Sequence, residues 1–135
     1  MIVNPEIKKL IPADLLELAE KSGVKRISAS SWLYAIRRLF GFFDPENKEI
    51  LIDLTRENKL LILYRKRYPE LNLVGPDVFI FLLLHEIGHS LYGEGELRAE
   101  EYAKKKFTEW RSEQRKKIVK AVQEALEEGF KARAV

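Results

Sequence analysis

The chain has 135 residues, 46% of them hydrophobic and 33% charged, with a net charge of +3. These values predict one soluble globular domain, exclude a disordered chain, and give no reason by themselves to expect nucleic-acid binding. The longest purely apolar run, residues 78–84, is far shorter than the roughly 20 residues of a membrane span. The N-terminus does not resemble a signal peptide, so we expect a cytoplasmic protein.

Cysteine is absent, which excludes disulfide bonds and thiolate metal sites. Any bound metal would therefore need His, Asp or Glu as its ligands. The many charged residues, beside a single methionine, are typical of a heat-adapted protein.

The N-terminal third has one clear element. Residues 5–22 have apolar residues at helical spacing and predict a single helix, with Pro12 near its start and Gly23 after its end. Residues 26–43 fit a helix and a strand equally well, because their apolar residues satisfy both periods.

A hairpin and another helix are expected next. The turn-forming residues 44–47 separate the apolar residues 39–43 from the strand-like residues 49–53, and this arrangement predicts a β-hairpin. Residues 54–67 then predict a helix with a buried side that consists of Leu60, Leu61, Leu63 and Tyr64.

The C-terminal half is expected to be helical. Residues 77–92 follow a strong helix start and are apolar nearly all round, which predicts a central buried helix. A second helix should begin near residues 94–96, bend near Ser112 and end at Gly129. The outer part of this helix has an apolar stripe that needs to be buried: Ile118, Val122, Ala125 and Leu126. The order of these elements predicts an α+β fold.

Residues 85–89, with the sequence HEIGH, match the H-E-x-x-H pattern. His85 and His89 are one helical turn apart on the same face, so both imidazoles can bind one metal ion. Glu86 is turned aside by about 100°, which places it beside a bound water as a general base and not among the ligands.

Three details favour a metal site over two histidines without a function. These are the only two histidines in the chain. They follow a run that must be buried, where unpartnered imidazoles would be costly. Gly88 costs about 1 kcal/mol in a helix interior and is expected where a neighbouring strand or the substrate approaches.

The third ligand must be acidic, because a catalytic zinc usually has three protein ligands. Helix geometry favours Glu96, which shares one face with Ala99, Ala103 and Phe107. Glu100, one turn further on, is expected to support a ligand histidine and remains the alternative third ligand. A solvated glutamate in the first turn, stabilised by the helix dipole, is the other interpretation of Glu96.

Residues 85–103, HEIGHSLYGEGELRAEEYA, resemble the gluzincin tribe of metallopeptidases, in which a glutamate on the next helix completes the site. Residues 96–103 match the E-x-x-A-[DN]-x-[FY]-A form of that helix, except that Glu100 stands where Asp is usual. The gap from His89 to Glu96 is short and needs a tight turn, for which Gly93 and Gly95 are suited.

The short chain is most similar to the minigluzincins of thermophilic prokaryotes. This resemblance implies a small zincin-like domain with a hairpin or small sheet, a backing helix, a buried active-site helix, a glutamate helix and a C-terminal helix. It also implies Zn²⁺ bound by His85, His89 and Glu96, with Glu86 as the catalytic base and Glu100 supporting the ligands.

We therefore expect a zinc metalloendopeptidase that acts on a peptide or protein. A zinc-activated water would attack the scissile carbonyl, with Glu86 as the proton acceptor. The oxyanion needs a further donor, and the sequence does not select among Tyr92, Arg98 and Tyr102. The edge of the hairpin is expected to hold the substrate by strand addition.

Two other functions are compatible with the motif. One is a regulatory metallopeptidase that cleaves a repressor protein. The other is a non-catalytic, zinc-stabilised binding module that contacts nucleic acid or a membrane through the basic residues between 111 and 120. Interleaved acids favour a solvated helix face for that run, and we expect no nucleic-acid partner. The presence of Glu86 favours an enzyme, because a structural zinc site needs no base.

The C-terminal segment raises the question of latency. We expect residues 1–128 to form the domain and residues 129–135 to form a tail. The resemblance implies a zymogen silenced by its own tail, or by a helix exchanged between chains in a homodimer. The apolar stripe and the tail could serve either purpose, whereas in the simplest alternative the helix packs on its own domain and the tail frays.

Overall fold

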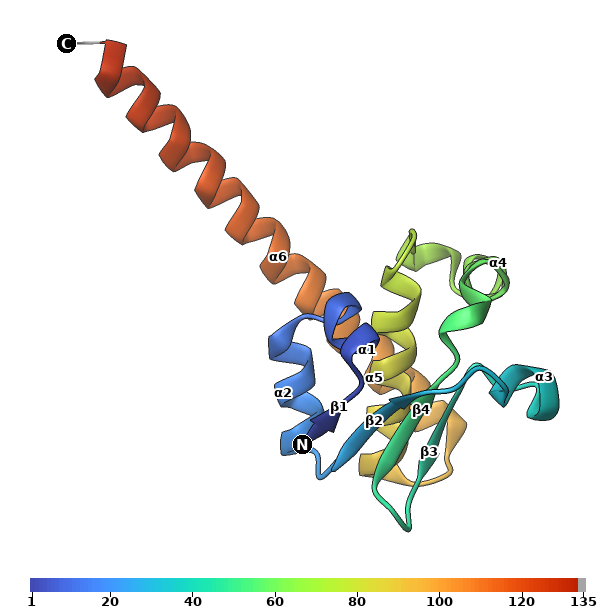
Figure 1. The fold of residues 1–135 in the computed structure, drawn as a ribbon. Helices are drawn as coiled ribbons and strands as arrows, with labels where there is room; N and C mark the ends of the chain where they lie inside the picture. Colours follow the sequence, from blue (N-terminus) through green and yellow to red (C-terminus); the bar gives the residue numbers. More distant parts are fainter. Residues whose placement is uncertain (134–135) are drawn as a thin grey trace.

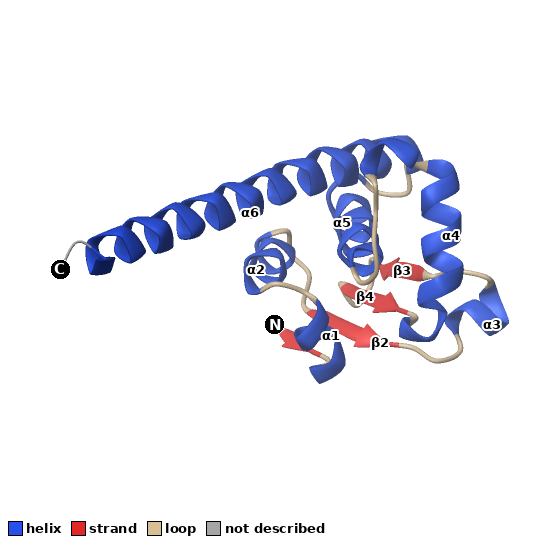
Figure 2. Ribbon diagram, turned by 90° about the horizontal axis from the view of Figure 1, so that it is seen from above, coloured by secondary structure: helices blue, strands red, loops and turns tan. Residues whose placement is uncertain are grey.

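The structure is a computed structural model in which residues 1–133 are described (Figure 1). A small mixed sheet forms one layer, and most of the helices lie on one side of it (Figure 2). The predicted α+β fold class is therefore confirmed.

The sheet has the strand order β1-β2-β4-β3. β1 (Ile2–Val3), β2 (Arg26–Ala29) and β4 (Glu49–Ile52) are parallel neighbours, and β3 (Gly41–Asp44) is antiparallel to β4. β3 and β4 form the predicted hairpin, which is confirmed. β3 is also an edge strand of this sheet, so one of its sides can face other parts of the molecule.

The N-terminal segment contains two helices, α1 (Pro5–Leu10) and α2 (Ala13–Lys21), so the single helix predicted for residues 5–22 is wrong. Ile11 has an extended backbone, as residues before a proline usually do, and Pro12 is the N-cap of α2. The preceding strand β1 was not predicted, because two residues are too few to show a strand period.

Residues 26–43, where the pattern was ambiguous, contain both kinds of structure. α3 (Leu33–Arg37) lies between β2 and β3. Two buried side chains hold its start: the Leu33 N–H donates to Ser30 Oγ at 3.0 Å, and the Tyr34 N–H donates to Asp53 Oδ2 at 3.0 Å. The switch between element types is therefore fixed by tertiary contacts.

A 3₁₀ turn (Leu54–Arg56) leads into α4 (Glu57–Arg67), as the helical pattern predicted. Leu60 and Tyr64 are buried and Leu61 is half-buried, but Leu63 is exposed, so its predicted burial is wrong. A second 3₁₀ turn (Pro69–Leu71) then leads towards the central helix.

The central helix α5 (Asp77–Tyr92) has the predicted bounds. It packs against the hairpin on one side and against the following helix on the other. Residues 78–84 are all buried, and the ring of Phe81 contacts those of Tyr64, Tyr68 and Phe107. The start of α5 thus forms much of the core, and its end carries the two histidines.

The last helix, α6 (Glu96–Arg133), is one continuous helix, so the predicted end at Gly129 is wrong. Its outer half projects away from the domain (Figure 1). The predicted burial of the stripe is also wrong: Ile118, Val122 and Leu126 are 53–63% exposed. Residues 129–133 continue the helix, and residues 134–135 of the predicted tail lie outside the described part. Among residues 1–133, no helix is both long and apolar enough to cross a membrane.

Candidate metal centre

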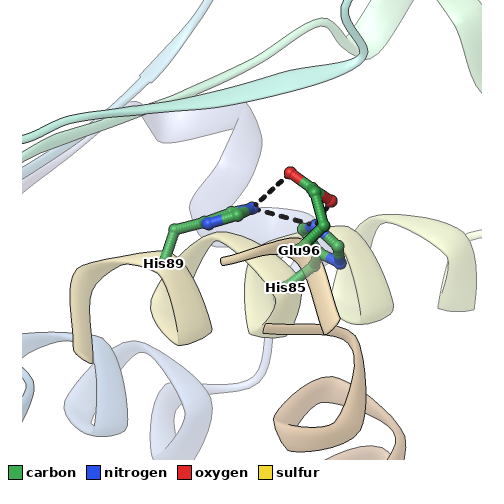
Figure 3. A group of neighbouring side chains, drawn as sticks. All are labelled: His85, His89 and Glu96. Atoms are coloured by element: carbon green, nitrogen blue, oxygen red, sulfur yellow. Dashed lines mark hydrogen bonds and ion pairs between the residues drawn. The ribbon is translucent and has the colours of Figure 1, made fainter. Parts of the chain in front are cut away.

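Three predicted ligands meet where the end of α5 faces the start of α6 (Figure 3). His85 Nε2 and His89 Nε2 are 3.1 Å apart. The carboxylate of Glu96 lies 3.1 Å from His85 Nε2 through one oxygen and 3.0 Å from His89 Nε2 through the other. Three potential ligand atoms from two helices therefore point at one place.

This donor set fits a zinc ion. Two imidazole nitrogens and one carboxylate are a usual set of protein ligands for catalytic zinc, which keeps one position open. Ligand atoms about 2.0–2.2 Å from a tetrahedral zinc lie about 3.3–3.6 Å from one another, slightly more than the separations seen here. Among the described residues, this His–His–Glu group is the one cluster of potential ligands close enough to share an ion.

The close approach of α5 and α6 depends on small residues. A Cβ atom placed on Gly88 would lie 2.8 Å from the Cα atom of Ala99. We expected a strand or a substrate at Gly88, but α6 approaches it instead. The predicted tight turn is confirmed at Gly93, which has a φ of 79° and ends α5.

His89 is held in the tautomer that a metal needs. Its Nδ1 lies 2.8 Å from the carbonyl oxygen of Gly93, so Nδ1–H donates there and Nε2 keeps its lone pair. Burial lowers the pKa of His85, and this effect outweighs the opposing charge of Glu96. His85 is therefore suited to bind a cation as a neutral ligand, and the bond to Gly93 turns Nε2 of His89 towards the same place.

Glu86 lies beside the three ligands, with only 5% of its surface exposed. Burial, followed by the negative charge of Glu96, raises the pKa of Glu86 to about 8, although a backbone hydrogen bond from Phe43 opposes the shift. A buried carboxyl with a raised pKa is well suited to take up and release a proton near neutral pH.

A cleft of about 380 Å³ runs between β3 and the end of α5. Its lining includes Glu86, His89 and Glu96 together with apolar residues that the sequence did not single out: Leu39, Gly41, Phe42, Phe43 and Pro45. These residues surround the hairpin strand β3, about 40 positions before the motif. The predicted hairpin was the one available signal for them.

The alternative ligand Glu100 lies outside the His–His–Glu group. Its carboxylate pairs with Lys104 at 3.5 Å and with Arg67 at 4.0 Å, and it accepts a hydrogen bond from the Tyr68 hydroxyl. The support we expected from Glu100 for a ligand histidine is provided for His89 by the Gly93 carbonyl.

The three oxyanion candidates lie elsewhere. Tyr92, Arg98 and Tyr102 line a second depression, which α2 borders through Leu18 and Lys21. None of the three lines the cleft that contains Glu86. The geometry therefore assigns no oxyanion role to them.

Comparisons with protein-family models, curated proteins and solved structures each return no match. Any function proposed for this chain therefore rests on the residues of the site alone.

Proposed function

We propose that this protein is a zinc-dependent metalloendopeptidase, with His85, His89 and Glu96 as zinc ligands and Glu86 as the catalytic base. One observation carries the proposal: the three ligand atoms converge within 4.8 Å of one another, beside a buried glutamate that is not among them. A structural zinc site has no use for this fourth residue, and its burial disfavours a mere binding module.

Zinc at this site would polarise the substrate carbonyl and lower the pKa of a water molecule. Glu86 accepts the proton of the attacking water and passes it to the leaving amine. Its carboxyl opens into the cleft next to His89, and the Phe43 backbone holds it there. The proton thus stays in the buried part of the site during the reaction.

The substrate is held along β3. The Asp53 N–H donates to the Phe40 carbonyl at 2.9 Å, so the backbone of Phe40 faces β4. By the alternation of an antiparallel pair, the backbone groups of Gly41 and Phe43 point away from β4. The Phe43 N–H reaches Glu86, and Gly41 remains to pair with an extended peptide. This mode of binding tolerates many sequences and suits the apolar lining of the cleft.

In this enzyme, the C-terminal segment of one copy inhibits a second copy. Gly129 is 33 helical residues beyond Glu96, which corresponds to about 50 Å. Residues 129–135 span at most about 25 Å when fully extended, so they cannot reach the cleft of their own chain. The exposed stripe on α6 is where a second copy would pair, forming a homodimer.

The experiment combines metal analysis with a peptide-cleavage assay. The wild-type protein should contain about one zinc per chain and lose activity with a chelator, and His85→Ala and His89→Ala should each lose the metal. Glu86→Gln is the matched control, which should keep zinc and the fold but not hydrolysis. Zinc at full occupancy in both histidine variants would refute the site, and wild-type cleavage by Glu86→Gln would refute the base.

A further inference from the structure

The end of the molecule formed by α3 and α4 exposes large apolar side chains. This α3–α4 end, defined as residues 31–39 and 54–67, lies opposite the C-terminal end of α6 (Figures 1 and 2). Ile36 on α3 is 73% exposed and Ile62 on α4 is 70% exposed. Trp32, Leu39 and Leu63 are also exposed. Neither the fold nor the proposed metal centre explains why these side chains are in water.

Basic side chains join the two helices into one surface. Arg38, Arg56 and Lys59 lie 5.3, 5.2 and 5.0 Å from the centre of the Tyr34 ring, so the ring connects α3 to the start of α4. From Lys59, the same face of α4 continues through residues three, four and seven positions on: Ile62, Leu63 and Lys66. Apolar and cationic groups are therefore interleaved on this face.

The charge balance of this end differs from that of the rest of the chain. Residues 31–39 and 54–67 contain seven basic residues and one acidic residue, Glu57. Elsewhere the chain has 17 basic and 20 acidic residues. The positive net charge of the protein is therefore concentrated here. Two of the seven already have partners, since Arg65 donates to the Leu73 carbonyl and Arg67 pairs with Glu100.

We propose that the α3–α4 end docks the protein on the surface of an anionic lipid membrane. Basic residues are attracted to anionic headgroups, while an indole and aliphatic side chains insert at the interface beneath them. A nucleic acid would match the positive charge but would leave Ile36 and Ile62 without a partner. A second copy of the chain would bring the same cations together and is disfavoured by their repulsion.

Docking in this orientation has a consequence for the cleft. Leu39 belongs to the α3–α4 end and also lines the cleft beside β3. A membrane-bound molecule would therefore hold the mouth of the cleft close to the lipid surface. The docking itself does not depend on the proposed metal site, so it can be tested on the metal-free protein.

The first experiment measures co-sedimentation of the full-length protein with lipid vesicles. Binding is expected to vesicles that contain phosphatidylglycerol and not to vesicles of phosphatidylcholine alone, and it should weaken as salt is added. The variant R37E/K59E should bind these vesicles about 30-fold more weakly, because each lost cation costs about fivefold in affinity. The matched control K116E/K117E makes the same charge change on the projecting half of α6 and should bind like the wild type.

The second experiment tests the apolar contacts. In a Trp110→Phe background, the fluorescence of Trp32 should shift to shorter wavelength on phosphatidylglycerol vesicles and become protected from an aqueous quencher. The variant I36S/I62S should weaken vesicle binding while leaving the circular dichroism spectrum unchanged.

Three outcomes would overturn the proposal. One is no binding to phosphatidylglycerol vesicles at low salt, and another is equal loss of binding in R37E/K59E and K116E/K117E. The third is tight binding to duplex DNA that is lost in R37E/K59E but not in I36S/I62S, with no change in the Trp32 spectrum on vesicles. That result would assign the surface to nucleic acid.

Discussion

Gly88 on α5 and Ala99 on α6 lie where the two helices that carry the candidate ligands touch. A Cβ atom at Gly88 would meet the Cα atom of Ala99 at 2.8 Å and its carbonyl oxygen at 3.0 Å. Both are backbone atoms of a helix, which cannot move aside as the end of a flexible side chain can. Glu96 lies one turn before Ala99, so any displacement of α6 at this contact also displaces the carboxylate that we propose as the third ligand.

Gly88→Ala should therefore weaken zinc binding by about tenfold or more and lower the free energy of unfolding by about 1–3 kcal/mol. The higher helix propensity of alanine, worth about 1 kcal/mol, offsets only part of this cost. Titration with zinc and thermal unfolding of the metal-free protein give the two quantities. Gly129→Ala is the matched control, because a Cβ atom there meets nothing within 4 Å. Equal behaviour of the two variants would show that the close contact does not position Glu96.

The ionisation of Glu86 makes the stability of the folded protein depend on pH. Its pKa is about 8 in the folded protein, against an ordinary value of 4.5, mainly because it is buried. Below pH 4.5 the carboxyl is protonated in both the folded and the unfolded state. Between pH 4.5 and 8 the unfolded chain releases this proton and the folded protein keeps it. The contribution of Glu86 to stability is therefore present at low pH and lost as pH rises to 8.

Glu86→Gln should consequently stabilise the metal-free protein at pH 8, by about 1–4 kcal/mol, and should have little effect near pH 4. Denaturant unfolding of zinc-depleted samples at the two pH values measures this difference. A Glu86→Gln variant that is equally destabilised at both values would contradict the raised pKa of Glu86.

At the scale of elements, the first two turns of α6 carry two glutamates that make different contacts. Glu96 faces both histidines, whereas Glu100 contacts Lys104, Arg67 and Tyr68. One turn of helix thus separates a candidate ligand from a residue that ties α6 to α4 and to the core.

Glu96→Ala should for this reason reduce zinc affinity more than Glu100→Ala, since the loss of a ligand outweighs the loss of a neighbouring charge. Glu100→Ala should mainly lower the melting temperature. Zinc titrations and thermal melts of the two variants separate these effects. A larger loss of zinc affinity in Glu100→Ala would place the third ligand one turn later.

The elements differ in how well the sequence predicted them. α5 could be predicted to its end residues, because a helix start, a long apolar run and a glycine all indicate the same bounds. The convergence of His85, His89 and Glu96 could be predicted, since the three residues lie within 12 positions on two adjacent helices. The hairpin edge was expected at the site, but the residues of β3 that line the cleft could not be predicted, because they reach it through tertiary packing from about 40 residues away. The break at Pro12 was missed because the helical spacing of the apolar residues continues across it.

At the scale of the whole molecule, the inner half of α6 packs on the domain and the projecting half does not. The last fully buried residue of α6 is Phe107, and Trp110 is half-buried against the core. Beyond residue 111, the exposed stripe has no neighbour among the described residues that would cover it. Helices in proteins owe most of their stability to the packing of an apolar face, which favours a partner for this one.

Deleting residues 113–135 should therefore leave a folded domain that still binds zinc, with a melting temperature close to that of the full chain. If the outer half of α6 silences a second copy, this truncation should raise peptidase activity, and so should dilution of the full-length protein. Analytical ultracentrifugation over a range of concentrations should show a dimer for the full chain and a monomer for the truncation. A full-length protein that stays monomeric, with unchanged activity after truncation, would contradict silencing between copies.

The continuity of α6 also has a mechanical consequence. Between Glu96 and the projecting half, Ala103 and Phe107 are buried in the core and Trp110 packs against it, so the inner part of α6 is clamped over several turns. Val122 lies 12 helical residues beyond Trp110, which corresponds to about 18 Å. A force on the outer stripe would therefore bend the helix beyond this clamp before it moved Glu96. The projecting half would then be a handle that a partner can hold without disturbing the geometry of the candidate metal centre.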